Sequence, residues 1–294
     1  MSFPPAATED QFDALDDDAL RPGVEALCDH LDLSGDVERF ADGSLPVYSV
    51  GPHHVLKLFP TVHLDEVATE RDVLAAVHGR LPVPTPGLRA AGEFGGWGYV
   101  LMERLRGASL RDVWPGLAAG ARRDVARQVG EALAALHAIT PPMPPVDWPG
   151  FVRTQRDGCV ARQRDRNLAP EWLEQVPDFL DSVDLGRPEP VLAHTEVMSA
   201  HLLIDGGRLT GLFDFEPAMR AAPEYEFVAT GVFLTRGDRG ANRALLGGYG
   251  RAVDPRRVLA YALLHVYSNL AWYLREAPTR ARTLDELAEH WFGH

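Results

Sequence analysis

The sequence has very little lysine, very little cysteine and no excess of positive charge. Of its 29 basic residues, only Lys57 is a lysine. The 42 acidic side chains give a formal net charge of −13, which argues against general nucleic-acid binding because that function needs basic patches. The two cysteines, Cys28 and Cys159, are too few for a disulfide framework. We therefore expect an acidic protein whose partner is cationic.

Long hydrophobic runs and a secretory leader are also lacking. The longest apolar stretch, Val258 to Leu274, contains three polar residues, so we expect a buried core helix there rather than a membrane span. The first five residues lack the basic and apolar regions of a signal peptide. The 294 residues are 46% hydrophobic and 24% charged, as in soluble globular proteins. These features predict a cytoplasmic protein without membrane contact, and they leave its oligomeric state open.

The single lysine lies in an apolar, strand-like run from His54 to Phe59. Because arginine supplies the positive charge everywhere else, Lys57 predicts a position where a compact ammonium fits and a planar guanidinium does not. Chance placement, or a lysine whose apolar stem lies along a strand, would explain the same observation.

The chain divides into three parts by the period of its apolar residues. Residues 1–20 are rich in acidic side chains and predict a partly mobile arm. Residues 21–105 alternate between strand and helix signals and predict a first lobe. Its expected elements are a helix over 23–33, strands over 37–40, 47–50 and 55–59, a helix over 64–78, and strands over 88–93 and 98–103.

Residues 106–294 have a different character. A strong helical period over 121–139 opens a helix-rich second lobe, which contains one compact β insertion near 191–214. In this insertion, an Asp-Gly-Gly turn joins two apolar strands and predicts a hairpin. The hairpin would bring Glu196, His201 and Asp214 together, and these are groups that can move a proton or hold a metal ion.

The order of these residues resembles the aminoglycoside phosphotransferase family, including hygromycin B kinase-like enzymes, within the protein-kinase-like phosphotransferases. The family's His-Gly-Asp-Leu loop is similar to the segment His194–Val197, and its later Asp-Phe pair is similar to Asp214–Phe215. A following Asp-Pro-x-Tyr-Asp-Leu motif corresponds to 222–227, and Leu-x-x-Leu-His corresponds to 133–137. The resemblance implies an α+β, bilobal kinase-like fold with an antiparallel N-terminal sheet and a mainly helical C-terminal lobe.

The resemblance also implies roles for individual residues in binding the nucleotide. Lys57 would contact the α and β phosphates of ATP, or of GTP, and would be held by Glu70 on the next helix. The loop at Ser44 would cover phosphates, and the hinge residues Met102, Glu103 and Leu105 would meet the adenine edge. Asp214, with His201, would bind Mg²⁺.

For the acceptor, the resemblance implies that Glu196 orients or deprotonates a hydroxyl group. Glu216 and the aromatic residues Tyr267, Trp272 and Tyr273 are the predicted acceptor contacts. The favoured acceptor is an aminoglycoside or related amino-sugar antibiotic, so the expected role includes antibiotic resistance, and the net charge of −13 would attract such a cation.

The sequence departs from the family pattern at three positions. Glu196 stands in place of an aspartate, His201 in place of an asparagine, and Glu226 in place of the aspartate that supports the loop. A carboxylate displaced by about 1 Å can cost on the order of 100-fold in rate. Two alternatives therefore stay open beside an ATP-dependent small-molecule kinase of this kind. One is a catalytically silent binder of nucleotide or antibiotic, and the other is a kinase for choline, homoserine or a methylthio-sugar.

Overall fold

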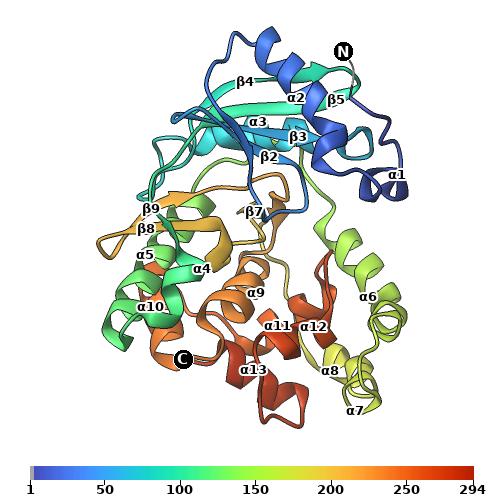
Figure 1. Ribbon diagram of the computed structural model, residues 1–294. Helices are drawn as coiled ribbons and strands as arrows, with labels where there is room; N and C mark the ends of the chain where they lie inside the picture. Colours follow the sequence, from blue (N-terminus) through green and yellow to red (C-terminus); the bar gives the residue numbers. More distant parts are fainter. Residues whose placement is uncertain (1–2) are drawn as a thin grey trace. The chain divides into compact units, whose positions relative to one another are not determined.

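The computed structural model describes residues 3–294 and contains two compact units (Figure 1). Among the described residues, the first unit comprises 3–79, 84–106 and 213–217, and the second comprises 80–83, 107–212 and 218–294. The first unit is built on an antiparallel sheet and the second is mainly helical, as predicted from the sequence. None of the helices within residues 3–294 is both long and apolar enough to cross a membrane.

The first unit contains a five-stranded antiparallel sheet with strand order β1-β2-β3-β5-β4. The strands lie within two residues of the expected bounds, because short apolar runs bounded by turn residues identify buried strands. Their bounds are Val37–Arg39 (β1), Val47–Val50 (β2), His54–Phe59 (β3), Leu88–Phe94 (β4) and Trp97–Glu103 (β5). The helices of this unit are Glu9–Asp13 (α1), Asp17–His30 (α2), the 3-10 turn Thr61–His63 (η1) and Glu66–Val77 (α3).

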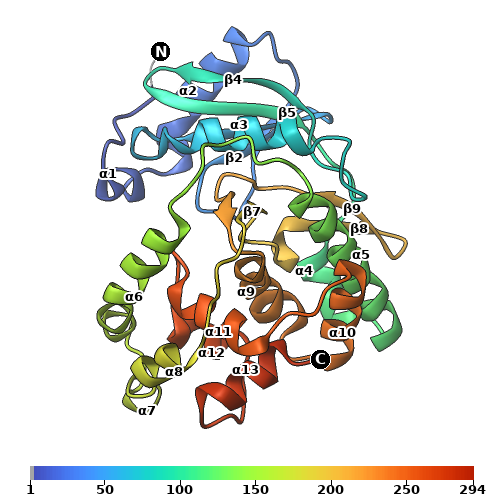
Figure 2. The same ribbon diagram turned by 180° about the vertical axis from the view of Figure 1, so that it is seen from behind.

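Helices α2 and α3 lie on opposite faces of this sheet (Figures 1 and 2). The apolar side of α2, with Leu20 and Val24, packs in one cluster with Leu56 and Leu58 of β3. Because side chains alternate along a strand, Lys57 points to the other face, where α3 lies. The alternation along β3 therefore determines which face receives the lysine.

The N-terminal residues pack against the first unit instead of forming the partly mobile arm that their charge predicts. Asp16 caps α2 by accepting a hydrogen bond from the amide of Ala19, so helix formation begins inside the acidic stretch. Phe3 is 5% exposed and stacks on Trp97, whose Nε1 donates to the carbonyl of Pro4. Burial of an aromatic ring of this size stabilises the packed segment, and acidic composition alone does not reveal it.

The second unit is helical around two small antiparallel sheets. Strands β8 (Leu202–Asp205) and β9 (Arg208–Leu212) form the predicted hairpin, and β6 (Ala108–Ser109) adds to β8. Strand β7 (Val191–Ala193) pairs with β10 (Met219–Ala221). The antiparallel pairing sets Ala193 opposite Met219, so the 194–201 loop starts beside the first residue of β10.

The helices of the second unit include the predicted long helix. Helices α5 and α10 lie side by side in both views (Figures 1 and 2). The bounds are Leu110–Val113 (α4), Trp114–Gly116 (η2), Ala119–His137 (α5), Trp148–Asp165 (α6), Pro170–Leu173 (α7), Val176–Ser182 (α8), Ser199–His201 (η3), Pro223–Glu226 (η4), Phe227–Ala229 (α9), Thr230–Thr235 (η5), Arg239–Tyr249 (α10), Pro255–Leu264 (α11), Leu270–Glu276 (α12) and Leu284–Phe292 (α13).

The single helix expected over Val258–Leu274 is wrong, because α11 ends at Leu264 and α12 begins at Leu270. His265 takes an extended backbone conformation with ψ 146°, which stops the first helix. Asn269 then caps α12 by accepting a hydrogen bond from the amide of Trp272. The polar residues that interrupt the apolar run thus form the turn between two helices.

Candidate functional site

Lys57 occupies the middle of β3, which is an inner strand of the sheet. It is paired with Val47 on β2 and with Val100 on β5. Its side chain is 3% exposed, so the ammonium is removed from bulk water. A buried ammonium needs compensating negative charge, because desolvation penalises the charged form strongly.

Three carboxylates surround the Lys57 ammonium within the first unit. Lys57 Nζ lies 3.2 Å from Glu70 Oε2 and 2.5 Å from Asp214 Oδ1, and it also donates to Glu216 Oε2. Glu70 comes from α3, whereas Asp214 and Glu216 come from the segment that follows β9. The contact between Lys57 and Asp214 joins residues that are 157 positions apart in the chain.

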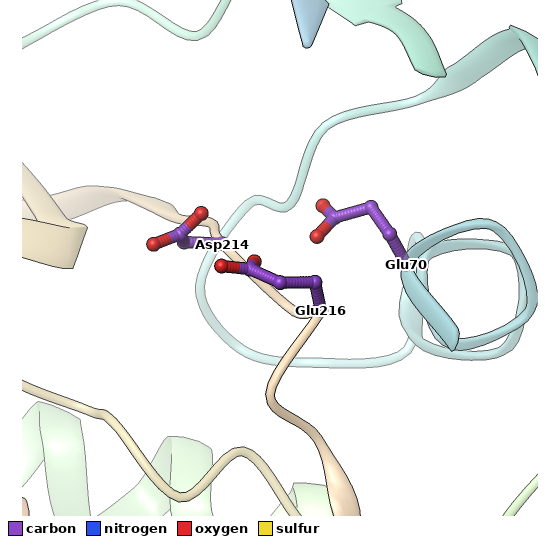
Figure 3. A group of neighbouring side chains, drawn as sticks. All are labelled: Glu70, Asp214 and Glu216. Atoms are coloured by element: carbon purple, nitrogen blue, oxygen red, sulfur yellow. The ribbon is translucent and has the colours of Figure 1, made fainter. Parts of the chain in front are cut away.

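The three carboxylates also lie close to one another (Figure 3). Each offers one oxygen, and these oxygens lie within 4.8 Å of one another. In this view the side chains of Glu70 and Glu216 extend in the same direction, and the carboxylate of Glu216 lies next to Asp214. Glu70 Oε1 is buried and has no hydrogen-bond partner among the described residues. The cluster therefore has more negative charge than one ammonium can balance, and one oxygen is available to a further donor or cation.

This crowding changes the proton affinity of both Lys57 and Glu216. Burial alone would lower the pKa of Lys57, but the attraction of Asp214, Glu70 and Glu216 outweighs it and raises that pKa well above its usual value. Burial raises the pKa of Glu216 well above its usual value, and the negative charges of Asp214 and Glu70 add to this while Lys57 opposes it. Lys57 therefore keeps its proton, and Glu216 resists ionisation.

Two residues of the candidate site have backbone conformations that residues other than glycine seldom adopt. Asp214 has φ 78° and Thr195 has φ 72°, both in the left-handed region. Such conformations cost free energy and persist only where the surroundings hold them. Both positions belong to the segments that the sequence motifs single out.

The predicted hinge lies at the end of β5, and its backbone amides take part in different hydrogen bonds. The amide of Glu103 donates to the carbonyl of Gly87, and the amide of Arg104 donates to the carbonyl of His53. None of the hydrogen bonds in the described part of the chain uses the amide of Leu105. Of these three amides, that of Leu105 is the one that can donate to a ligand.

The other two residues predicted to contact the nucleotide differ in exposure. Ser44 lies in the exposed turn between β1 and β2. Met102 is 5% exposed and is part of the core of β5. A ligand in this unit can therefore meet the Ser44 turn directly, whereas Met102 contributes packing.

In the second unit, Glu226 holds the loop that contains Glu196. Its Oε2 accepts the amide of His194 at 2.6 Å, and its Oε1 accepts the amide of Thr195 at 3.1 Å. The side chain of Glu226 is fully buried. This longer acid therefore performs the structural task that the sequence analysis assigns to an aspartate.

Histidines shape the same loop from within. The amide of Glu196 donates to Nδ1 of His194 at 3.3 Å. Nδ1 of His201 donates to the carbonyl of Glu196 at 2.8 Å, which leaves the lone pair of a neutral ring on Nε2. Both histidines thus form hydrogen bonds to the backbone of the loop, His194 as an acceptor and His201 as a donor.

The aromatic residues predicted to contact the acceptor differ in accessibility. Tyr267 is 54% exposed and Trp272 is 37% exposed, so both present ring surface to a ligand. Tyr273 is 2% exposed, and its hydroxyl donates to the carbonyl of Tyr267 at 3.4 Å. Tyr273 therefore belongs to the core under this surface rather than to the surface itself.

Glu216, predicted to contact the acceptor, belongs instead to the Lys57 cluster in the first unit. The sequence does not indicate this position, because side-chain direction after β9 is not periodic.

His265 is a residue near the candidate site that the sequence analysis does not single out. It is buried and stacks on Tyr225 at a ring distance of 4.5 Å. Burial lowers its pKa to about 4, while Glu226 and the backbone of Thr195 act in the opposite direction. The interruption of the Val258–Leu274 run is the signal by which His265 could have been noticed.

Comparison with known proteins places this geometry in context. The profile of the phosphotransferase enzyme family (APH) matches residues 36–261. A curated aminoglycoside 3′-phosphotransferase from Niallia circulans is 28% identical over 203 residues, which span 64% of this chain and 72% of that protein.

Solved structures share the fold at lower identity. The GDP complex of aminoglycoside 2′-phosphotransferase-IIIa has a TM-score of 0.69 and 19% identity, with 92% of this chain and 98% of that chain covered. The macrolide 2′-phosphotransferase MphH from Brachybacterium faecium has a TM-score of 0.62 and 20% identity, with 92% and 97% covered. These matches confirm the predicted kinase-like fold. Because the family profile spans most of the sequence, this chain belongs to the phosphotransferase enzyme family.

Proposed function

We propose that the protein transfers the γ-phosphoryl group of ATP, or of GTP, to a hydroxyl group of a small cationic molecule of the aminoglycoside or amino-sugar class. The observation that carries this proposal is the buried Lys57 ammonium in contact with Glu70 and Asp214, in a member of a phosphotransferase family. Phosphoryl transfer depends on positioning and charge neutralisation, and this cluster supplies a fixed cation beside acidic groups.

Lys57 binds the phosphates of the donor in this proposal. Glu70 fixes the ammonium from α3, since its Oε2 lies 3.2 Å from Lys57 Nζ and its side chain is fully buried. The donor's phosphate oxygens replace Glu216 and Asp214 as partners of the ammonium. At the other end of the donor, the amide of Leu105 donates to the edge of the base.

The carboxylates of this cluster fit a divalent cation. Asp214 and Glu216 offer oxygen donors, which Mg²⁺ prefers, and Glu70 Oε1 is a buried acceptor without a partner among the described residues. When bound, Mg²⁺ supplies neutralisation of phosphate charge.

Glu196 accepts the proton of the acceptor hydroxyl. The acceptor oxygen forms a bond to the γ phosphorus, the bond from that phosphorus to the β–γ bridging oxygen breaks, and the hydroxyl proton passes to the Glu196 carboxylate. Glu226 and His201 hold the backbone of this loop, the former through two amides and the latter through the carbonyl of Glu196. Tyr267 and Trp272 provide the exposed aromatic surface on the acceptor side.

Two observations support the class of acceptor. The relatives in solved structures include complexes with streptomycin, gentamicin and hygromycin B, and also a macrolide phosphotransferase. The net charge of −13 favours an acceptor that carries several ammonium groups. We therefore place aminoglycosides ahead of macrolides.

The test is phosphate transfer by the purified chain with radiolabelled ATP or GTP and Mg²⁺. The acceptors are streptomycin, gentamicin, hygromycin B, a macrolide, choline and homoserine, and the products are separated by mass. Labelled aminoglycoside is the expected result. Nucleotide binding without transfer to any acceptor would identify a silent binder, and transfer to choline or homoserine alone would identify a metabolite kinase. Either outcome would overturn the proposal.

A further inference from the structure

The second unit contains a cavity apart from the residues discussed so far. Its volume is about 460 Å³, and it lies between the segment that leads into β7, the start of η4, the end of α10 and the start of α11. We call it the arginine cavity, because its lining includes Arg187, Arg251 and Arg257 together with Glu189, Glu224 and Tyr249. No residue given a role in the proposed function lines it.

The charges in the arginine cavity are only partly compensated. Arg257 lies 3.6 Å from Glu224 and 3.9 Å from Asp254, so its charge is balanced within the protein. Within residues 3–294, neither Arg187 nor Arg251 forms an ion pair or a side-chain hydrogen bond. Glu189 is the one remaining acid of the lining, so the balance of free charge is positive and favours an anion.

The shape and chemistry of the lining fit a small molecule. Cavities of this volume are typical of small-molecule sites, which combine apolar walls with a few polar anchors. Tyr249 is 8% exposed and offers one ring to the cavity, and aliphatic side chains provide the rest of its apolar lining. Guanidinium groups match the geometry of carboxylate and phosphate oxygens.

We propose that the arginine cavity binds a small organic anion, with its carboxylate or phosphate group held by Arg187 and Arg251 and its body packed against the ring of Tyr249. Arginine binds either oxyanion, and the probes below distinguish the two. This site is independent of the proposed function, because the residues that form it are separate from those of the Lys57 cluster and from Glu196.

Tyr249 connects the cavity to the loop of the candidate site. Its hydroxyl hydrogen-bonds to Nδ1 of His137 at 2.9 Å, and Nε2 of His137 lies 3.6 Å from Glu226 Oε2. Glu226 in turn accepts the amides of His194 and Thr195. All five groups are buried, and Nε2 of His137 has no hydrogen-bond partner among the described residues, so an anion that shifts the Tyr249 hydroxyl would move the His137 ring against Glu226 and alter its bonds to these two amides.

The experiment measures binding of phenyl phosphate and benzoate to the full chain by calorimetry, with phenol as the uncharged control. We expect one site for at least one of the two anions and none for phenol. Arg187→Gln and Arg251→Gln should each weaken binding by about tenfold, since each removes one charge-assisted contact. Arg243→Gln, which changes an exposed arginine of α10 outside the lining, should leave the affinity unchanged.

A further variant separates this cavity from the Lys57 cluster. Lys57→Met should leave the affinity for phenyl phosphate and benzoate unchanged. Loss of binding in Lys57→Met with retention in both arginine variants would overturn the proposal, and so would the absence of binding by either anion. Thermal unfolding of each variant identifies any that fails to fold, and the two single arginine changes serve as alternatives to each other.

Hydrogen exchange tests the connection through Tyr249. Binding of the anion should change the exchange rates of the His194 and Thr195 amides in the unmodified chain. Tyr249→Phe keeps the aromatic ring but removes the hydroxyl, so it should retain binding and lose this change. Unaltered exchange at both amides in the unmodified chain, with the anion bound, would overturn the connection.

Discussion

Lys57 shows how strongly one side chain can depend on its surroundings. An ammonium that is 3% exposed is stable only because carboxylates offset its desolvation, and here Glu70, Asp214 and Glu216 all contact it. Two of these acids approach from a segment more than 150 positions away in the chain. A wider, planar guanidinium cannot make the same contacts from the same strand position, because its donors are spread over a rigid fork.

Lys57→Arg therefore tests whether charge or shape matters at this position. We expect the rate of phosphate transfer to fall by at least about 100-fold, since a displacement of about 1 Å at such a site has an effect of this order. Turnover and nucleotide affinity are measured together, with Arg71→Lys on the exposed surface of α3 as the control exchange. Unchanged turnover and affinity would remove Lys57 from the mechanism.

Glu196→Asp tests whether the loop is built around the longer acid. Glu226 accepts the amides of both His194 and Thr195, so the backbone of the loop is held independently of the length of the acid at position 196. We expect Glu196→Asp to lower turnover by about 100-fold, because the carboxylate would withdraw by about 1 Å from its working position. Glu196→Gln gives the rate without a base. A faster rate for Glu196→Asp would show instead that the natural residue impairs catalysis.

His265 predicts a dependence of stability on pH. Burial lowers its pKa to about 4, below its usual value of 6.5, so the unfolded chain binds a proton that the folded chain excludes. Stability contributed by the neutral ring is therefore complete above the unfolded pKa and is lost as pH falls toward the folded pKa. Between about pH 7 and about pH 5 the loss should be about 2 kcal/mol.

Urea unfolding of His265→Asn at the same pH values measures this contribution. Asparagine can still accept the amide of Tyr267, which Nδ1 of His265 accepts at 3.2 Å, but it does not titrate. Between about pH 7 and about pH 5, the free energy of unfolding of the variant should therefore fall by about 2 kcal/mol less than that of the natural chain. His294→Asn, at an exposed position, controls for the loss of a histidine. An equal slope in His265→Asn and in the natural chain would contradict the assignment.

At the scale of elements, the close approach of α5 and α10 depends on glycine. A Cβ on Gly130 of α5 would collide with the carbonyl of Leu245 on α10, and one on Gly248 would collide with the carbonyl of Arg127. The backbones of the two helices therefore meet directly at these positions. Neither glycine could be identified from the helical period alone, because periodicity identifies apolar faces and not the separation between helices.

Gly130→Ala should destabilise the chain by about 1 to 3 kcal/mol, since the backbone atoms it meets cannot move aside as a side chain could. Gly247→Ala is the matched control, because a Cβ there meets no atom within 4 Å. It should instead stabilise α10 by about 0.5 to 1 kcal/mol. Thermal and urea unfolding measure both variants. A stabilised Gly130→Ala would show that the two helices can separate without cost.

Sequence patterns predict some elements here and miss others for physical reasons. The strands of the first unit and the β8–β9 hairpin are found because short apolar runs and turn residues are local features of the sequence. The division of Val258–Leu274 into α11 and α12 depends on the cap at Asn269, which an apolar run conceals. The place of Glu216 and the positive φ of Thr195 and Asp214 depend on tertiary contacts, which no local period encodes.

At the scale of the whole molecule, the family resemblance supplied what local patterns could not. It assigned both Lys57 and Asp214 to nucleotide binding, and Lys57 Nζ lies 2.5 Å from Asp214 Oδ1 across 157 positions of the chain. It gave no information about the N-terminal residues, which fall outside the family profile and yet include Phe3 and Leu20 in the core of the first unit. Composition does not reveal the packing of these residues either, because composition reports charge whereas packing depends on a few apolar residues.

Net charge is the property of the whole chain that leads to a prediction about substrates. Under the proposed function, a formal charge of −13 should attract a polyamine acceptor and repel a nucleotide that keeps net negative charge with its magnesium. These long-range terms weaken as salt shortens the Debye length from about 20 Å near 20 mM to about 6 Å near 300 mM.

Raising the salt concentration from about 20 mM to about 300 mM should therefore affect the kinetic constants of the two substrates differently. For gentamicin, kcat/KM should fall by about tenfold while kcat changes little, because steering affects encounter and not the bound complex. For the nucleotide, KM should stay constant or decrease. A macrolide with a single amine provides the control, since its kcat/KM should fall much less. Equal sensitivity of the two acceptors to salt would show that the acidic charge of the chain has no part in selecting the acceptor. The contacts around Tyr267 and Trp272 would then make the selection.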